Sequence, residues 1–86
     1  MTAAPSTVTM YTTSWCGYCM RLKGQMDREG IRYEVVDIEQ HPEAAEIVER
    51  VNHGNQTVPT VVFPDGSAQT NPSIAQIKQK LAALAA

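Results

Sequence analysis

The two cysteines of this chain limit what can hold its fold together. They are Cys16 and Cys19, and a disulfide between them closes a ring that spans only residues 16–19. On the chain-entropy model such a ring stabilises a fold by about 2 kcal/mol at most, because the joined residues are already neighbours. Small secreted domains usually carry several bridges. The chain must therefore fold on a hydrophobic core, and redox chemistry explains the cysteine pair better than structural cross-linking does.

The composition is that of one small globular domain. The 86 residues are 43% hydrophobic and 19% charged, which excludes a disordered tail, a collagen-like fibre and a coiled coil. A formal net charge of −2 argues against a nucleic-acid binder, which needs a basic face. No apolar stretch approaches the roughly 18 residues that span a membrane. Residues 1–7 contain no Lys or Arg and no apolar run, so we do not expect them to act as a signal peptide. We expect a flexible leader over 1–6, one domain over 7–84, and a monomer in a reducing cytoplasm.

Alternating hydrophobic patterns predict the element order β-α-β-α-β-β-α. Segments rich in Val, Ile, Thr and Tyr predict strands over 7–12, 31–38, 60–63 and 68–70. Helical spacing predicts one helix over 17–29, a second that starts at 40–42, and a third that Asn71 caps, with Pro72 at its first position. We expect the first two strands to be parallel, the last two to form a hairpin, and the helices to cover both faces of the sheet.

The predicted helix over 17–29 makes the two cysteines unequal. Cys19 falls on the same apolar stripe as Leu22 and Met26, so its sulfur should face the core. Cys16 lies at the N-terminus of the helix, where free backbone N–H groups and the positive end of the dipole favour an anion. There the pKa of a thiol can fall from about 8.5 to about 3.5–7.5. We predict that Cys16 is the nucleophile and that Cys19 forms the redox disulfide with it.

A zinc site is the main alternative for a Cys-x-x-Cys pair. Such a site needs four ligands, and only His41 and His53 are available to complete it. The two histidines lie twelve positions apart, which is not the spacing of a zinc motif, and a second cysteine pair is missing. We therefore favour redox chemistry, expect no bound metal, and assign neither histidine a catalytic role.

Residues near the cysteines and before the third strand are candidates for substrate contact. Trp15 and Tyr18 should lie in a solvent-facing turn, where they either cover the edge of the core or touch substrate. Pro59 follows Val58 at the start of an apolar strand. The peptide bond between them is either trans, at the beginning of an edge strand, or cis in a tight turn. The residues alone leave both questions open.

Three segments together resemble the glutaredoxin family of the thioredoxin fold. They are Trp15-Cys16-Gly17-Tyr18-Cys19 after the first strand, Thr57-Val58-Pro59 before the third, and Asp65-Gly66 with Asn71-Pro72-Ser73 before the last helix. The resemblance covers residues 8–84. It implies a four-stranded mixed sheet flanked by three helices, with a cis Pro59 beside Cys16 and a Val58 backbone that pairs with the substrate's main chain. It further implies that Trp15, Tyr18, Thr57 and Asn71 contribute to substrate binding.

Several positions depart from the glutaredoxins that use glutathione. Those enzymes usually carry Cys-Pro-Tyr-Cys shortly after a lysine, whereas residues 11–15 contain no lysine. The basic residue that commonly precedes Thr-Val-Pro is Gln56 here, and residues 70–73 replace the turn that holds the γ-glutamyl end of glutathione. Carboxylate-binding groups are thus missing at both ends of a glutathione site. The whole set of motifs is similar to the mycoredoxins, the glutaredoxin-like enzymes of actinobacteria that use mycothiol, a neutral sugar conjugate of acetylated cysteine.

This resemblance implies an oxidoreductase that removes mycothiol from protein–mycothiol mixed disulfides, with Cys16 as the nucleophile. Mycothiol would be a co-substrate and no cofactor would be bound. A separate flavin enzyme, mycothiol disulfide reductase, would recycle the oxidised mycothiol with NADPH. Two alternatives stay open. One is a dithiol reductase of protein disulfides, such as a donor to ribonucleotide reductase, in which Cys19 is essential. The other is an iron–sulfur carrier with Cys16 as a ligand.

Overall fold

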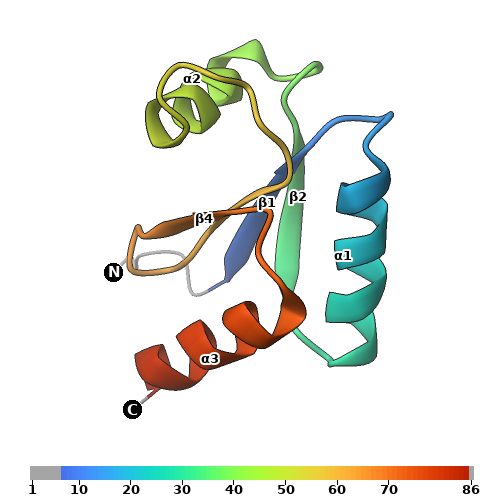
Figure 1. Cartoon of the computed structure of the whole chain (residues 1–86), viewed down its shortest axis with the longest axis vertical. Helices are drawn as coiled ribbons and strands as arrows, with labels where there is room; N and C mark the ends of the chain where they lie inside the picture. Colours follow the sequence, from blue (N-terminus) through green and yellow to red (C-terminus); the bar gives the residue numbers. More distant parts are fainter. Residues whose placement is uncertain (1–6, 86) are drawn as a thin grey trace.

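The helices and strands follow the predicted order (Figure 1). A computed structural model describes residues 7–85, so the predicted leader over 1–6 lies outside the described residues. The strands are β1 (Val8–Thr12), β2 (Tyr33–Asp37), β3 (Thr60–Val62) and β4 (Ala68–Thr70). The helices are α1 (Gly17–Arg28), α2 (Pro42–Val51) and α3 (Ile74–Ala85). None of the helices that the structure describes is long and apolar enough to cross a membrane.

The four strands form one mixed sheet in the order β2-β1-β3-β4. β1 and β2 are parallel, with Met10 opposite Val35, because α1 carries the chain back to the end of the sheet where β1 began. β3 runs antiparallel to β1, and β4 runs antiparallel to β3. The predicted parallel pair and the predicted hairpin are both confirmed.

A tight turn joins β3 to β4. The Phe63 N–H donates to the Ser67 carbonyl at 2.8 Å, and Gly66 adopts a φ of +88°, which costs glycine little. The Asp65 carboxylate accepts hydrogen bonds from the hydroxyl and the N–H of Ser67. These bonds, with a further contribution from Lys80, lower the pKa of Asp65 to about 2. The turn residues thus hold the hairpin that carries the chain from β3 to the start of α3.

Two hydrophobic clusters hold the helices on opposite faces of the sheet. In the larger cluster, Met26 of α1 and Ile77 of α3 are fully buried together with Met10 of β1. In the smaller cluster, Val48 of α2 packs with Tyr11 of β1. Figure 1 shows α1 and α2 on opposite sides of β1 and β2. The predicted coverage of both faces by helices is confirmed.

The start of α3 differs from the prediction, because Asn71 does not cap it. Asn71 adopts a φ of +46°, and its N–H donates to the Pro59 carbonyl at 2.8 Å. Ser73 caps the helix instead: its hydroxyl accepts from the Gln76 N–H at 3.1 Å, and the Gln76 side chain accepts from the Ser73 N–H at 2.8 Å. This reciprocal pair is a capping box. Pro72 therefore precedes the helix and does not lie in its first turn.

Candidate active site

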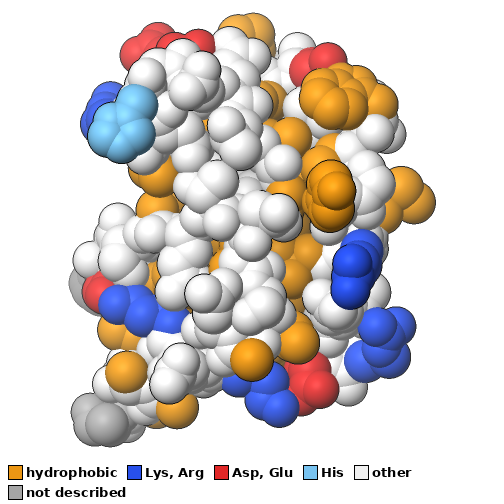
Figure 2. Space-filling model, viewed as in Figure 1, with side chains coloured by type: hydrophobic (Ala, Val, Ile, Leu, Met, Phe, Trp, Pro, Cys, Tyr) orange, Lys and Arg blue, Asp and Glu red, His pale blue; other side chains and the backbone are white. Residues whose placement is uncertain are grey.

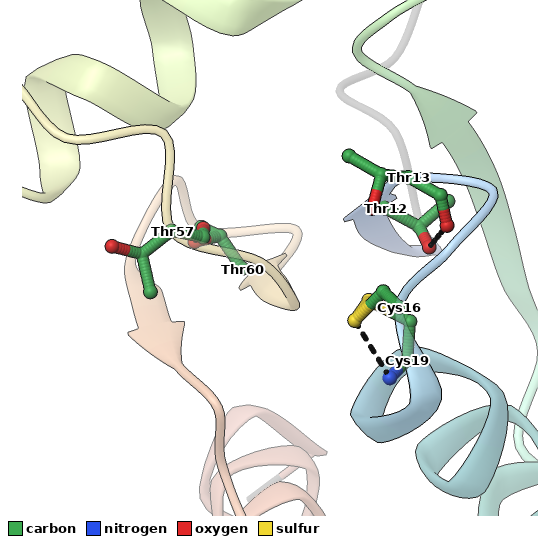
Figure 3. Close-up of a disulfide and its surroundings, with 6 residues drawn as sticks. All are labelled: Thr12, Thr13, Cys16, Cys19, Thr57 and Thr60. Carbon is green, nitrogen blue, oxygen red and sulfur yellow. Dashed lines mark hydrogen bonds between the residues drawn. A yellow bond between two sulfur atoms is a disulfide. The ribbon is translucent and has the colours of Figure 1, made fainter.

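The cysteine pair lies where β1 passes into α1. Cys16 is the N-cap of α1, with an extended backbone, and Cys19 is in the first turn. A disulfide joins the two residues, whose Cα atoms are 5.2 Å apart (Figure 3). Sγ of Cys16 accepts a hydrogen bond from the Cys19 backbone N–H at 3.1 Å. The sulfur thus occupies the capping position that a serine or aspartate oxygen usually takes.

The local structure around Cys16 favours a negative charge. The first turn of α1 contains no acidic residue, so no carboxylate competes for its free N–H groups. In the reduced protein the N–H that points at Sγ would stabilise a thiolate more than a thiol, because hydrogen bonds to charged acceptors are stronger. Cys19 is completely buried on the stripe with Leu22 and Met26, as predicted, while Cys16 is 4% exposed. Cys16 is therefore the less buried of the two cysteines.

The segment before β3 faces the cysteines (Figure 3). The peptide bond between Val58 and Pro59 is cis, as the family resemblance implied. Pro59 is fully buried, and Val58 packs against the core cluster that contains both cysteines. Among the described residues, the N–H and C=O of Val58 take no part in the hydrogen bonds of loops and turns. They are free to pair with an extended chain, which is how a sheet edge commonly binds a peptide.

Two aromatic side chains lie on the surface beside the cysteines. Trp15 is 71% exposed and Tyr18 is 65% exposed, so neither covers the edge of the core. The Trp15 indole N–H donates to the carboxylate of Glu39, in the loop before α2, at 3.1 Å. Figure 2 shows exposed hydrophobic side chains gathered over the start of α1. Both aromatic residues are thus placed to touch a substrate that reaches Cys16.

A groove of about 350 Å³ extends from the first turn of α1 to the start of α3. Its polar lining residues are Tyr18, Arg21, Gln25, Asn71, Ser73 and Gln76. Arg21 is the only charged side chain among the lining residues that the structure describes. Charged side chains are scarce on the surrounding surface as well. Figure 2 shows uncharged groups at the centre of this face and charged side chains mostly at its rim. The groove therefore suits a ligand that is rich in hydrogen-bonding groups and poor in charge.

Sequence reasoning missed four polar residues of this groove: Arg21, Gln25, Ser73 and Gln76. The signal for the first two was present, because Tyr18, Arg21 and Gln25 are spaced so that they share one face of α1. The signal for Gln76 was its position three residues after Ser73, which is the spacing of a capping box.

The two histidines lie at opposite ends of α2. His41 precedes the helix, with its Nδ1 atom 3.5 Å from the Glu43 carboxylate, and His53 follows it with a φ of +57°. A helix of this length separates its ends by about 15 Å, so both cannot bind one metal ion. Within residues 7–85 no three His, Cys, Asp or Glu side chains come together in a group that could hold a metal.

We expect reduction of the disulfide to leave the secondary structure intact. The bridge joins two positions of a single helical turn, whereas the core clusters connect all three helices to the sheet. Far-ultraviolet circular dichroism spectra of the oxidised and reduced protein should nearly coincide. A large loss of ellipticity on reduction would show that the bridge is a structural cross-link.

Comparisons with known proteins point to one family. A family model described as Glutaredoxin matches residues 8–67. A Mycobacterium tuberculosis protein provisionally named as a glutaredoxin is 56% identical over 78 residues, which cover 91% of this chain and 93% of that protein. Mycoredoxin 1 of Corynebacterium glutamicum is 46% identical over 80 residues, which cover 93% of this chain and 99% of that protein. The crystal structure of a glutaredoxin from Methanosarcina mazei superposes with a TM-score of 0.76 at 26% identity, over 88% of this chain and 78% of that one.

Proposed function

The chain belongs to the glutaredoxin family of thiol–disulfide oxidoreductases, and we propose that it removes mycothiol from protein–mycothiol mixed disulfides. The observation that carries this proposal is the groove along the first two turns of the helix that Cys16 caps, whose lining offers several polar groups and a single charge, Arg21. The similarity to Mycoredoxin 1 also supports mycothiol as the substrate thiol. In this proposal mycothiol is a co-substrate and no cofactor is bound.

The reaction consists of two thiol–disulfide exchanges at Cys16. The Cys16 thiolate attacks the mycothiol sulfur of the mixed disulfide, and the client protein leaves as a thiolate that takes up a proton. The thiolate of a second mycothiol then attacks the mycothiol sulfur bound to Cys16, which forms mycothiol disulfide and releases the Cys16 thiolate. A mycothiol disulfide reductase would return the oxidised product to mycothiol with NADPH. The disulfide between Cys16 and Cys19 must first be reduced, which two mycothiol molecules accomplish in the same way.

Binding of the mixed disulfide requires groups on both sides of Cys16. We assign the main chain of the substrate thiol to the free backbone groups of Val58, next to Pro59 and Thr57. The sugar part of mycothiol would lie in the groove, where Asn71 and the glutamines offer hydrogen bonds. Trp15 and Tyr18 would cover the mixed disulfide from the solvent side.

Charges near the segment that faces Cys16 disfavour a thiol with two carboxylates. The Gln56 side chain donates to the Glu49 carboxylate at 2.7 Å, so the position where glutathione-using relatives commonly carry a cation lies against an acid here. Arg21 is the one cation in the groove, and it is exposed. Glutathione therefore meets at most one cation in the groove for its two carboxylates, whereas a neutral thiol needs no cation.

We expect the wild-type protein to turn over mycothiol mixed disulfides faster than the matching glutathione mixed disulfides. Arg21→Gln should lower glutathione turnover further and leave mycothiol turnover nearly unchanged. Gln56→Arg alone should raise glutathione turnover only slightly, because Glu49 would pair with the new cation, and Glu49→Gln with Gln56→Arg should raise it more. Exposed ion pairs contribute about 1 kcal/mol or less, so each change should be a few-fold.

The assay offers both mixed disulfides of one client peptide in parallel. Equal or faster turnover of the glutathione form by the wild-type protein would contradict the proposed substrate. Equal responses of the two substrates to Arg21→Gln would contradict the electrostatic reason for the preference.

A dithiol reductase of protein disulfides remains the second candidate. The observation in its favour is that Cys16 and Cys19 already form a disulfide, so an internal thiol is near enough to release a trapped client. An iron–sulfur carrier with Cys16 as a ligand is the other alternative. A brown colour on purification would distinguish that role.

We propose a monomer that acts in the cytoplasm, where thiols are kept reduced.

A further inference from the structure

One asparagine amide connects three separate segments of the chain. Asn52 follows the last turn of α2, and its Nδ2 donates to the Val48 carbonyl at 2.7 Å and to the Thr60 hydroxyl at 3.0 Å. Its Oδ1 accepts a hydrogen bond from the Thr70 hydroxyl. Both ends of the Asn52 amide are therefore used, and they join α2 to the first residue of β3 and the last residue of β4.

The network continues into the segment that faces the cysteines. The Thr60 hydroxyl, which is completely buried, donates to the Thr57 carbonyl at 2.8 Å and so closes the segment around Pro59 (Figure 3). One residue beyond Thr70, the Asn71 N–H donates to the Pro59 carbonyl at 2.8 Å. Thr60 and Thr70 are also opposite each other in the β3–β4 register. A chain of hydrogen bonds thus fixes residues 57–59 and residues 70–71 relative to each other.

We propose that Asn52 is a positioning residue that sets the affinity for the mixed disulfide. It contacts neither cysteine, and it acts through the two segments that it holds in place. The inference rests on the proposed function only in taking residues 57–59 and Asn71 as the substrate-binding side. Small displacements of such segments weaken binding strongly, because a substrate is held by several contacts that must be made at once.

The hydrogen bonds that remain without the Asn52 amide distinguish a positioning role from a purely structural one. Without the Asn52 amide, the Thr60 hydroxyl still donates to Thr57, the Val48 carbonyl still accepts from the Asn52 backbone N–H at 3.0 Å, and the exposed Thr70 hydroxyl meets water. No buried donor or acceptor is orphaned, so the stability lost should be small. What is lost is the side-chain link from Thr60 to Thr70, one of the restraints that hold residues 57–59 against β4 beside the Asn71–Pro59 hydrogen bond and the β3–β4 pairing.

The test compares Asn52→Leu with the wild-type protein on both mycothiol and glutathione mixed disulfides. On whichever substrate the wild type prefers, we expect KM to rise about tenfold with little change in kcat, since uniform binding is what is removed. The pH dependence of Cys16 alkylation should be unchanged. Amide hydrogen exchange at Asn71 should be faster than in the wild-type protein, because its acceptor, the Pro59 carbonyl, is less restrained.

Matched variants decide whether the effect belongs to this network. Asn55→Leu removes a neighbouring exposed amide that bonds only to the Asn52 carbonyl, and it should leave KM unchanged. Thr60→Val should raise KM. Thr60→Ser keeps the hydroxyl, so its KM should stay at the wild-type value. The double variant Asn52→Leu with Thr60→Val should show a KM little higher than that of either single variant. If Asn52→Leu does not fold, the Thr60→Val and Thr60→Ser pair answers the same question.

Two results would overturn the proposal. One is an unchanged KM together with unchanged exchange at Asn71. The other is a fall in kcat, or a shift in Cys16 alkylation, without a change in KM. A wild-type preference for glutathione would refute the proposed thiol, yet the KM ratio between variant and wild type on that substrate would still test the role of Asn52.

Discussion

Cys16→Ser should abolish reduction of the mixed disulfide, while Cys19→Ser should keep most of the activity. Serine at position 16 has no thiolate to attack a disulfide, so turnover should fall to the background of uncatalysed exchange. Cys19 is completely buried beneath the helix end, and the small thiol that clears the intermediate arrives from solution. Initial rates of mycothiol release from a labelled client measure both effects.

The Cys19→Ser protein should also accumulate the intermediate of the reaction. Intact mass spectrometry should show an adduct one mycothiol heavier, located on Cys16. A buried, poorly paired hydroxyl costs about 1–3 kcal/mol, so Cys19→Ala serves as a second variant without that group. If both Cys19 variants are folded but as inactive as Cys16→Ser, the dithiol reductase is the correct function and the monothiol mechanism is wrong.

The features that could be read from the sequence are those set by local patterns. The stripe with Cys19 and Leu22 predicts which face of α1 is buried, and the position of Cys16 before that stripe predicts its place at the helix N-terminus. Strand-forming segments and the turn around Gly66 likewise predict the hairpin. Each of these depends on residues within a few positions of one another, which is where propensity and periodicity are informative.

The features that escaped prediction depend on contacts between distant segments. Trp15 bonds to Glu39, 24 positions later, and Asn52 bonds to Thr70, 18 positions later. Neither pair follows from a period, because loop conformation decides which side chains meet. The start of α3 is another example: Asn71 adopts a left-handed backbone and donates its N–H to the distant Pro59 carbonyl, and Ser73 caps the helix. The proposed substrate-binding segments, residues 57–59 and 70–71, are held mainly by such contacts, whereas the cysteine pair itself lies within one helical turn.

A negative charge at position 17 should make the protein more stable and less reactive. Gly17 is the first residue of α1, next to Cys16, and a Cβ added there meets no atom within 4 Å. Gly17→Glu should stabilise the helix, because glutamate favours an N-terminus and glycine costs about 0.5–1 kcal/mol within a helix. The same charge should raise the pKa of the reduced Cys16 thiol, because a nearby anion disfavours a thiolate.

Iodoacetamide alkylation of reduced protein across pH measures the acidity of Cys16, and thermal unfolding measures stability. The wild-type inflection should lie clearly below about 8.5, the value of a free thiol. A folded pKa below the unfolded one would mean that the thiolate stabilises the reduced protein above the unfolded pKa, and that this contribution is lost as pH falls through the folded pKa. Gly17→Gln is the matched control: it should raise the melting temperature and leave the inflection in place. A wild-type inflection at or above 8.5, or equal inflections in the glutamate and glutamine variants, would mean that the helix terminus does not activate Cys16.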